Sequence, residues 1–321
     1  MAQFKNLKDL LKKFSDEQAC RDFLVQKRWN GVPTCPYCGC TKSYKIENGK
    51  RFKCANKECY KKYSVTIGTV AQDTNIPLST WFAATYLITA HKKGISSCQL
   101  GRDLGVAQKT AWFMLHRIRE ALRDKKGLLL TSEVQADETY IGGKEEFKHE
   151  SKKLHKGASL DLKVPVIGLQ ETGGKVVTQV APWVTKKVVS EMIETHVKKP
   201  AVLVTDSAPV YFKIGKKFDH KIVNHSAHEY VMDGFHVNGL ENYWSLVKRG
   251  IIGIYHHVSP DHLQSYLDEF SFRFNSRKVK DNDRFEVTLS NLEGSMPYKK
   301  LVAQKLDRNG AGKEIEQIPE E

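Results

Sequence analysis

Three acidic residues in the second half of the chain are spaced so that they could hold divalent cations. Asp137 lies in the run ADETYIGG, Asp206 follows the apolar run AVLVT, and Glu241 lies in NGLENYWSLVKRG. Cutting or joining a phosphodiester by in-line displacement uses two divalent cations about 4 Å apart, one at the attacking oxygen and one at the leaving oxygen. Mg²⁺ prefers hard oxygen ligands to thiolates. Three carboxylates on separate elements are therefore suited to this chemistry.

The segment around Glu241 predicts a helix with one polar and one apolar face. Residues three, four and seven apart share a helix face, so Glu241, Ser245 and Lys248 project together, and Asn238 could join them. A lysine beside carboxylates can meet a phosphate as a point charge. An exposed surface helix would pair a glutamate with a lysine in the same way, so the spacing alone also fits that alternative. The apolar side consists of Leu240, Tyr243, Trp244 and Val247.

The cysteines predict a second metal site of a different kind. Cys35 and Cys38 form a C-x2-C pair, and Cys54 and Cys59 form a C-x4-C pair that follows 15 residues later. Two such pairs fit a zinc ribbon with four thiolates around one tetrahedral ion, which is a closed, structural site. Cys40 follows the first pair closely and could substitute for one ligand. The alternative is a set of buried thiols or a redox C-x2-C, which would not need the second pair.

The elements that must position the carboxylates alternate between strand and helix patterns. The order is β-β-β-α-β-α-β-α, which is the ribonuclease-H-like arrangement of a mixed sheet with helices on both faces. In that order Asp137 lies on the first strand, Asp206 at the carboxyl end of the fourth, and Glu241 on the helix after the fifth. The first and fourth strands are neighbours in that sheet, so distant residues can converge. The expected strands are 133–141, 162–172, 174–184, 201–211 and 221–225. Expected helices lie at 188–199 and 238–251.

The positive charge of the chain is concentrated in its first part. Residues 1–126 contain 24 Lys+Arg and 10 Asp+Glu, whereas residues 127–321 contain 27 of each, so the net charge of +14 arises before residue 127. A polyanion, and nucleic acid in particular, is the partner that this asymmetry favours. The alternative is a basic surface that serves solubility alone.

Residues 77–124 predict a helix-turn-helix within this basic part. A short helix in 96–106 ends at Gly105 and a longer one follows in 107–122, which is helix, glycine-containing turn, helix. The second helix would present Gln108, Lys109 and Thr110 at its N-terminal end, where base edges are read. We expect further DNA contacts from Arg117 and Arg249. An ordinary helical hairpin, in which Trp112, Leu115 and Ile118 merely pack, is the alternative.

These patterns divide the chain into several parts and exclude some protein classes. No run of 18 apolar residues is present, so we expect no membrane span. The odd cysteine count argues against a secreted disulfide framework. We therefore expect a multidomain α+β protein with a helical lead-in at 1–30, a zinc ribbon at 31–72, a helix-turn-helix domain at 73–127, a catalytic domain at 128–290 and a partly disordered extension at 291–321.

Taken together, the motifs resemble those of the DDE transposases of bacterial insertion sequences, in the group with an N-terminal zinc ribbon. The resemblance covers about residues 20–285 and rests on CPYCG, RFKC, KYSVTIGTV, ADETYIGGK, VTDSAPVY and the long stretch from HVNGLENYWSLVKRG to FNSR. It implies that Asp137, Asp206 and Glu241 are the catalytic carboxylates and that Lys248 is their associated lysine. Some relatives use Asn or His as the third ligand, so Asn238 is the alternative here, with His236 close by.

The resemblance also implies cofactors and partners. Two Mg²⁺ or Mn²⁺ ions would serve catalysis, and one zinc ion would be structural. The partners would be double-stranded DNA, both transposon ends and target, and further copies of the chain in at least a dimer. Such a protein would work on the nucleoid in the bacterial cytoplasm. Two rival functions are a sequence-specific DNA-binding regulator with a silent catalytic domain and a nuclease without strand transfer.

Overall fold

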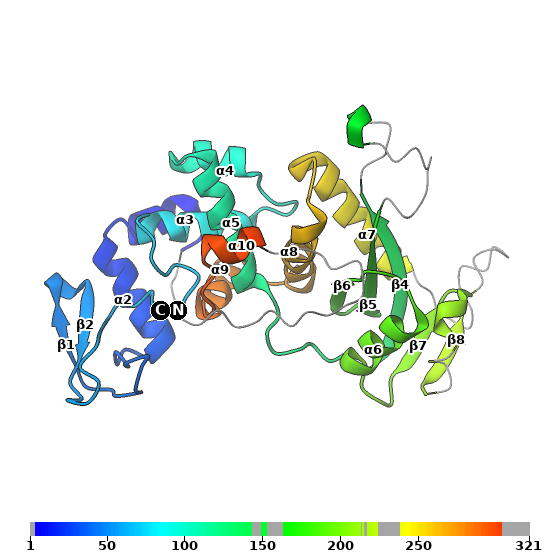
Figure 1. The fold of residues 1–321 in the computed structure, drawn as a ribbon, viewed down its shortest axis with the longest axis horizontal. Coiled ribbons are helices and arrows are strands. Elements are labelled where there is room, and N and C mark those ends of the chain that lie inside the picture. Colours follow the sequence, from blue (N-terminus) through cyan, green and yellow to red (C-terminus); the bar gives the residue numbers. More distant parts are fainter. Residues whose placement is uncertain are drawn as a thin grey trace. The chain divides into compact units, whose positions relative to one another are not determined.

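The structure of the chain is a computed structural model that describes residues 4–142, 149–152, 163–212, 214, 217–223 and 238–303. It divides into two units (Figure 1). Among the described residues, unit 1 comprises 4–123 and 276–303, and unit 2 comprises the described part of 124–275. Each unit has a hydrophobic core of its own.

Unit 1 begins with two capped helices that pack into an aromatic core. The side chains of Asn6 and Asp16 accept hydrogen bonds from the first-turn amides of α1 and α2, which satisfies donors that have no partner within the helix. The rings of Phe14, Phe82 and Phe285 meet in the core, within 7 Å of one another. The helices of unit 1 are α1 (Leu7–Lys13), α2 (Glu17–Trp29), α3 (Leu78–Ala90), α4 (Ser97–Leu104), α5 (Gln108–Leu122), α9 (Asp281–Ser290) and α10 (Tyr298–Ala303).

The cysteine-rich segment folds as a three-stranded antiparallel sheet. Its strands are β1 (Ser43–Ile46), β2 (Arg51–Cys54) and β3 (Lys62–Tyr63), in that order. Alternation along the strands sends Phe52 and Tyr63 to one face, where both rings meet the edge of Trp29 from α2. The ribbon is therefore anchored to the helical lead-in through its apolar face.

The two helices of the predicted helix-turn-helix lie where the sequence indicated. Ser96 caps α4 by accepting from the Gln99 amide, and Gly105 ends it in the left-handed region at φ 66. The turn is tight, because a Cβ atom at Gly101 would lie 2.9 Å from the Val106 carbonyl oxygen. Helix α5 then begins at Gln108.

Residues 276–290 belong to unit 1, although we expected the catalytic domain to extend to residue 290. Helix α9 buries Phe285 in the aromatic core, and Lys27 of α2 forms an ion pair with Glu286 at 2.6 Å. Arg284 donates a hydrogen bond to the Thr89 carbonyl oxygen at the end of α3. These contacts are made by residues far apart in sequence, which local patterns do not reveal.

Unit 2 is built on a five-stranded mixed sheet with the order β6-β5-β4-β7-β8 (Figure 1). The first three strands of this sheet in chain order, β4, β5 and β6, pair antiparallel, and β7 and β8 run parallel to β4. This order and these directions confirm the ribonuclease-H-like arrangement. The strands are β4 (Glu133–Ile141), β5 (Val164–Glu171), β6 (Val176–Val180), β7 (Val202–Thr205) and β8 (Asp219–Ile222).

Helices cover both faces of this sheet. Helix α6 (Lys186–His196) packs on one face through Val189, Met192 and Ile193. Helices α7 (Asn238–Gly250) and α8 (Leu263–Asn275) pack on the other, over Val164, Val166 and Val176. Because side chains alternate along β4, Val134 and Ala136 face α6, whereas Gln135 faces α7 and accepts a hydrogen bond from the Leu240 amide.

The connection between β7 and β8 differs from the expected order. The strand predicted at 201–211 is shorter, because β7 ends at Thr205 and residues 209–211 form a 3₁₀ turn; the described residues between β7 and β8 contain no α-helix, and β8 starts two residues before the predicted strand at 221–225. Proline at 209 disfavours helical backbone at the preceding residue, and Ala208 is accordingly extended, with φ −65 and ψ 134. The last two residues of the predicted strand, 224 and 225, lie outside the described residues.

Candidate active site and zinc centre

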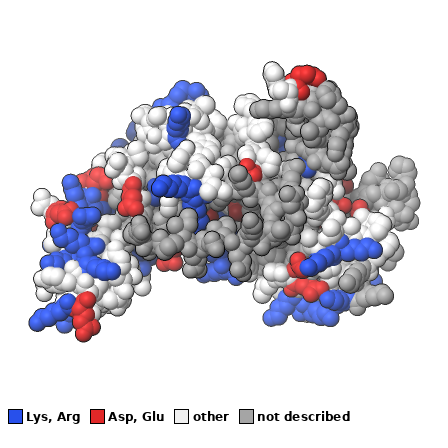
Figure 2. Space-filling view, viewed as in Figure 1, with Lys and Arg blue, Asp and Glu red and all other residues white. Residues whose placement is uncertain are grey.

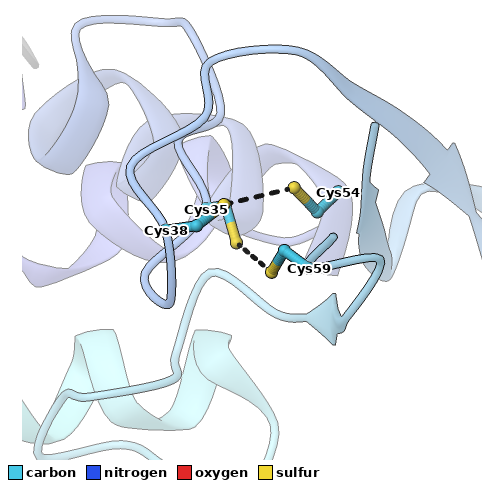
Figure 3. Close-up of side chains that lie close together, drawn as sticks. All are labelled: Cys35, Cys38, Cys54 and Cys59. Carbon is cyan, nitrogen blue, oxygen red and sulfur yellow. Dashed lines mark hydrogen bonds between the residues drawn. The ribbon is translucent and has the colours of Figure 1, made fainter. Parts of the chain in front are cut away.

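The four predicted zinc ligands come together at one end of the ribbon (Figure 3). Their sulfur atoms all lie within 4.8 Å of one another, with 3.7 Å between Cys35 and Cys59 and 3.5 Å between Cys38 and Cys54. A tetrahedral zinc ion at about 2.3 Å from each sulfur would separate any two sulfurs by about 3.8 Å. The donor set and its spacing therefore fit a closed structural zinc site.

Cys40, the possible substitute, is not a member of this group. Its sulfur lies 3.6 Å from the Lys42 carbonyl oxygen, and its own carbonyl oxygen accepts a hydrogen bond from the Cys35 amide. Gly39 between the two has φ 72, a conformation that glycine adopts without strain. Cys40 thus helps to close the first knuckle through its backbone.

Asp137 lies on β4 and faces α7, where Trp244 fixes its orientation. The indole Nε1 of Trp244 donates a hydrogen bond of 2.9 Å to Asp137 Oδ2. The residue paired with Asp137 on β5 is Gly168, and a Cβ atom there would lie 2.5 Å from the Trp244 ring. The glycine therefore leaves the space through which the indole reaches the carboxylate.

The surroundings of Asp137 favour its neutral form. Burial raises the pKa of Asp137 to about 6, and the negative charges of Glu138 and Asp206 act in the same direction. The Trp244 hydrogen bond opposes this shift. A partly buried carboxylate with carboxylate neighbours is stabilised by a cation, so the electrostatics suit a metal ligand.

Asp206 comes directly after β7, in register with Asp137. Ala136 on β4 is paired with Thr205, the last residue of β7, and an aspartate follows each of these two residues in the chain. The Asp206 carboxylate accepts a hydrogen bond of 3.0 Å from the Ala208 amide. The two aspartates therefore follow directly on the last paired residues of neighbouring strands.

Helix α7 contributes the remaining predicted catalytic residues from across a cleft. Glu241, Lys248 and Arg249 are exposed and line this cleft of about 450 Å³, together with Asp137 and Glu138 on β4, whereas Asp206 is not among its lining residues. Asn238, the alternative third ligand, is exposed at the first residue of α7 and is not among the residues that line the cleft. His236 lies outside the described residues.

The structure does not bring the three predicted carboxylates, Asp137, Asp206 and Glu241, into one compact group. Among the described residues, the four cysteines are the only group of three or more His, Cys, Asp and Glu side chains whose ligand atoms all lie within 4.8 Å of one another.

Two residues of this site were missed by sequence reasoning. Trp244 was assigned only to the apolar side of its helix, and Tyr211 was not considered. The phenol of Tyr211 donates a hydrogen bond of 2.6 Å to Glu138 Oε2. Burial raises the pKa of Glu138, and this hydrogen bond opposes the shift. No local pattern signals either contact, because each joins segments far apart in the chain.

The predicted DNA-binding residues of α5 have different fates. Lys109 is exposed and Thr110 half-buried near the N-terminal end of the helix, and Gln108 is exposed, with its amide 2.9 Å from the Ser97 hydroxyl of α4. Arg117, in contrast, is only 5% exposed. Its guanidinium donates to the Gln72 carbonyl oxygen and stacks on Trp81 and Phe113. Arg117 is therefore a core residue and does not reach DNA.

The outer face of the ribbon is basic and carries exposed aromatic rings. Register pairs Tyr44 with Lys53 and Lys53 with Lys62, so these three side chains form a row on the face opposite Phe52. The Lys53 ammonium lies 3.6 Å from the centre of the exposed Tyr60 ring. Figure 2 shows lysine and arginine side chains gathered over this end of unit 1.

Comparisons with known proteins match two parts of the chain. The family model described as the ISXO2-like transposase domain matches residues 129–275, and that of the transposase zinc-ribbon domain matches residues 15–62. A transposase-like protein of Haemophilus influenzae is 30% identical over 107 residues, which are 33% of this chain and 85% of that protein. The chain belongs to the ISXO2-like transposases.

Other similar proteins include a further mobile-element protein and solved transposase complexes. A protein in transposable element ISH50 of Halobacterium salinarum is 27% identical to this transposase over 279 residues, which are 82% of this chain and 92% of the relative. The Mos1 strand transfer complex and a pre-cleavage Mos1 transpososome are each 12% identical, and each match covers 67% of this chain. The matches cover 79% and 80% of those chains, with TM-scores of 0.26 and 0.23.

The family match places a boundary where the structure has one. The transposase domain match ends at residue 275, which is also the last residue of the sheet-containing part of unit 2. Of the helices that the structure describes in this transposase, none combines the length and hydrophobicity that a membrane span requires.

Proposed function

We propose that this transposase binds the terminal inverted repeats of an insertion sequence, cuts the DNA strands there and joins the 3′ ends to target DNA. The observation that carries the proposal is Asp137 on β4 and Asp206 directly after the neighbouring β7, with Asp137 in a cleft that Glu241 and Lys248 also line. Three carboxylates and a lysine from three separate elements are what metal-dependent phosphodiester chemistry needs.

In this proposal Asp137, Asp206 and Glu241 hold two Mg²⁺ or Mn²⁺ ions. Bound ions would lower the barrier by activating the attacking oxygen and stabilising the leaving oxygen. Trp244 holds the Asp137 carboxylate in one orientation, as outer partners of metal ligands commonly do. Lys248 and Arg249 are exposed on the same side of α7 and meet the DNA phosphates as cations.

DNA recognition is assigned to unit 1. Gln108 and Lys109 at the start of α5 are exposed, as residues that read base edges must be. The row of Tyr44, Lys53 and Lys62 on the outer face of the ribbon supplies further contacts to the phosphate backbone. One zinc ion held by the four cysteines keeps that face in shape.

The decisive experiment uses a labelled duplex that ends in the inverted repeat flanking the gene, together with a supercoiled target plasmid. Wild-type protein with Mg²⁺ is expected to cut the duplex and to transfer the labelled 3′ end to the plasmid. Asp206→Asn should bind the duplex but neither cut nor join it, because one ligand charge is lost.

Two other results would contradict the proposal in distinguishable ways. Cutting without joining, over a range of target concentrations, would indicate a nuclease. Specific binding without any Mg²⁺- or Mn²⁺-dependent cutting by the wild type would indicate a DNA-binding regulator. Synapsis of two ends requires at least a dimer, so light scattering of the complex with the duplex should give a mass of two or more chains.

A further inference from the structure

The pairing of β4 with β7 ends one residue before either aspartate. Its last pair is Ala136 with Thr205. Beyond this point β4 continues against β5, but Asp206 has left the sheet and begins the connection to β8. The ladder therefore does not fix the distance between the Asp137 and Asp206 carboxylates, although both must reach the same pair of ions.

A series of short contacts spans this gap. Asp206 accepts a hydrogen bond from the Ala208 amide, and the Ala208 carbonyl oxygen accepts one of 3.1 Å from the Tyr211 amide. The phenol of Tyr211 then donates at 2.6 Å to Glu138. Because Glu138 is bonded to Asp137 along β4, these contacts connect the two aspartates through residues other than the sheet ladder.

Tyr211 is held rigidly at the centre of this series. Its side chain is fully buried in the core on the α6 side of the sheet, with Ala136 and Leu203 in the same cluster. Glu138 alternates with Asp137 along β4, and its Oε2 atom accepts the hydrogen bond from the buried Tyr211, while Glu138 also borders the cleft that Glu241 lines. One Glu138 oxygen is thus engaged by a phenol on the opposite side of the sheet from Trp244.

We propose that Tyr211 and Glu138 form a brace that positions Asp206 beside Asp137, and that Glu138 is a positioning residue and not a metal ligand. This inference rests on the proposed function, because it names what aligns the carboxylates of that site. The brace fixes the segment 206–211 to β4 at its far end, while the end of β7 fixes it at Asp206.

Two isosteric substitutions separate a brace from a ligand. Tyr211→Phe removes the donated hydrogen bond but leaves the Glu138 charge in place. Glu138→Gln removes the charge but keeps an oxygen that can accept from the phenol. A brace predicts that Tyr211→Phe raises the Mg²⁺ concentration for half-maximal cleavage by roughly 10- to 100-fold, the effect typical of outer partners of metal ligands. It predicts a much smaller shift for Glu138→Gln, and a maximal rate close to wild type in both.

A second measurement does not depend on cleavage. The free Mn²⁺ signal in electron paramagnetic resonance, recorded on the full chain without DNA, should show weaker binding for Tyr211→Phe and near-normal binding for Glu138→Gln. Tyr255→Phe is the matched control, because it removes a phenol-to-carboxylate hydrogen bond to Glu269 elsewhere in unit 2. It should leave the Mn²⁺ titration unchanged.

A variant that misfolds does not protect the proposal. Glu138→Ala removes the acceptor from the other end of the bond, so it must reproduce the shift of Tyr211→Phe, and the double variant must add little to either. If Glu138→Gln loses Mn²⁺ as fully as Asp206→Asn does while Tyr211→Phe binds normally, Glu138 is a ligand and the brace is overturned. If wild type and Tyr211→Phe have the same Mg²⁺ midpoint, the brace alone is overturned. The proposed function is overturned as well if the wild type shows no metal-dependent cutting and if its Mn²⁺ binding is the same as that of Asp206→Asn.

Discussion

The pKa of Asp137 is raised to about 6, mainly because the carboxyl group is buried. A raised pKa means that the folded chain binds a proton more tightly than the unfolded chain, in which an aspartate has a pKa of about 3.9. The associated stability is fully present below pH 4 or so and is lost as the pH rises through about 6. Asp137 therefore weakens the fold at neutral pH when no cation neutralises it.

Replacing Asp137 by asparagine should remove this loss. Without added Mg²⁺ or Mn²⁺, we expect Asp137→Asn to be more stable than wild type at pH 7, by about 3 kcal/mol, since the pKa is raised by about two units and each unit corresponds to about 1.4 kcal/mol. The difference should shrink towards pH 4, where the aspartate is protonated in the folded chain and about half protonated in the unfolded chain. Urea unfolding of both proteins between pH 4 and pH 8 measures it. A constant difference across this range would contradict the assigned pKa.

The third metal ligand is a prediction at the same scale. Glu241 lines the cleft and Asn238 does not. We therefore expect Glu241→Gln to abolish cleavage of an inverted-repeat duplex while sparing DNA binding, and Asn238→Ala to cut nearly normally. Lys248→Ala should be milder than Glu241→Gln, because a phosphate contact positions DNA without holding an ion. Normal cutting by Glu241→Gln together with loss of cutting by Asn238→Ala would make Asn238 the ligand.

At the scale of elements, the ribbon depends on its four cysteines. Purified protein should contain about one zinc ion per chain, as a single four-ligand site requires. Cys54→Ser should lose the metal and the fold of the ribbon, because the ribbon core around Phe52 is small. Metal analysis and circular dichroism measure both effects. Cys98→Ser is the control. Cys98 is exposed on α4 and is not one of the four ligands, so this variant should keep its zinc. Full zinc retention in Cys54→Ser would disprove this ligand set.

The contact between α7 and the sheet depends on one missing side chain. Gly168→Ala would introduce a Cβ atom 2.5 Å from the Trp244 ring, which must move away and release Asp137. We expect a loss of about 1–3 kcal/mol in the free energy of unfolding, as for other overpacked cores, and a large drop in cleavage. Gly253→Ala is the control, because nothing lies within 4 Å of its added Cβ atom. Equal stability and activity in the two variants would show that α7 does not need this gap.

At the scale of the whole molecule, the charge asymmetry predicts where DNA binds. The excess of lysine and arginine lies before residue 127. Binding of the element ends should therefore weaken steeply with salt, and each lost phosphate contact should reduce the slope of log K against log salt by about one. Lys62→Ala on the ribbon should show this reduction, measured by fluorescence anisotropy. Lys187→Ala on α6, which is also an exposed lysine but lies in unit 2, should keep the wild-type slope.

Lys109 should behave differently from Lys62. If α5 enters the major groove, Lys109→Ala weakens binding to the inverted repeat more than binding to unrelated DNA, because base contacts specify and phosphate contacts do not. Competition with both duplexes at one salt concentration measures the ratio. An equal loss on the two duplexes would show that Lys109 contacts only the backbone.

Local features of this transposase could be predicted from the sequence alone. The cysteine pairs, the helix that ends at Gly105 and the alternating strands are set by interactions between residues close in the chain, so spacing and turn chemistry suffice to find them. The choice of Asp137, Asp206 and Glu241 came from the same motifs together with the family resemblance.

Only the tertiary structure decided which distant side chains meet. Arg117 was predicted to contact DNA. In the structure its buried guanidinium donates a hydrogen bond to the Gln72 carbonyl oxygen and lies over the Trp81 ring. Helix α9 follows the five-stranded sheet of unit 2 in the chain, yet Phe285 completes the core of unit 1. The hydrogen bonds from Trp244 to Asp137 and from Tyr211 to Glu138 join segments more than 70 residues apart. Burial and hydrogen-bond pairing at such separations are properties of the packed chain, and no local pattern encodes them.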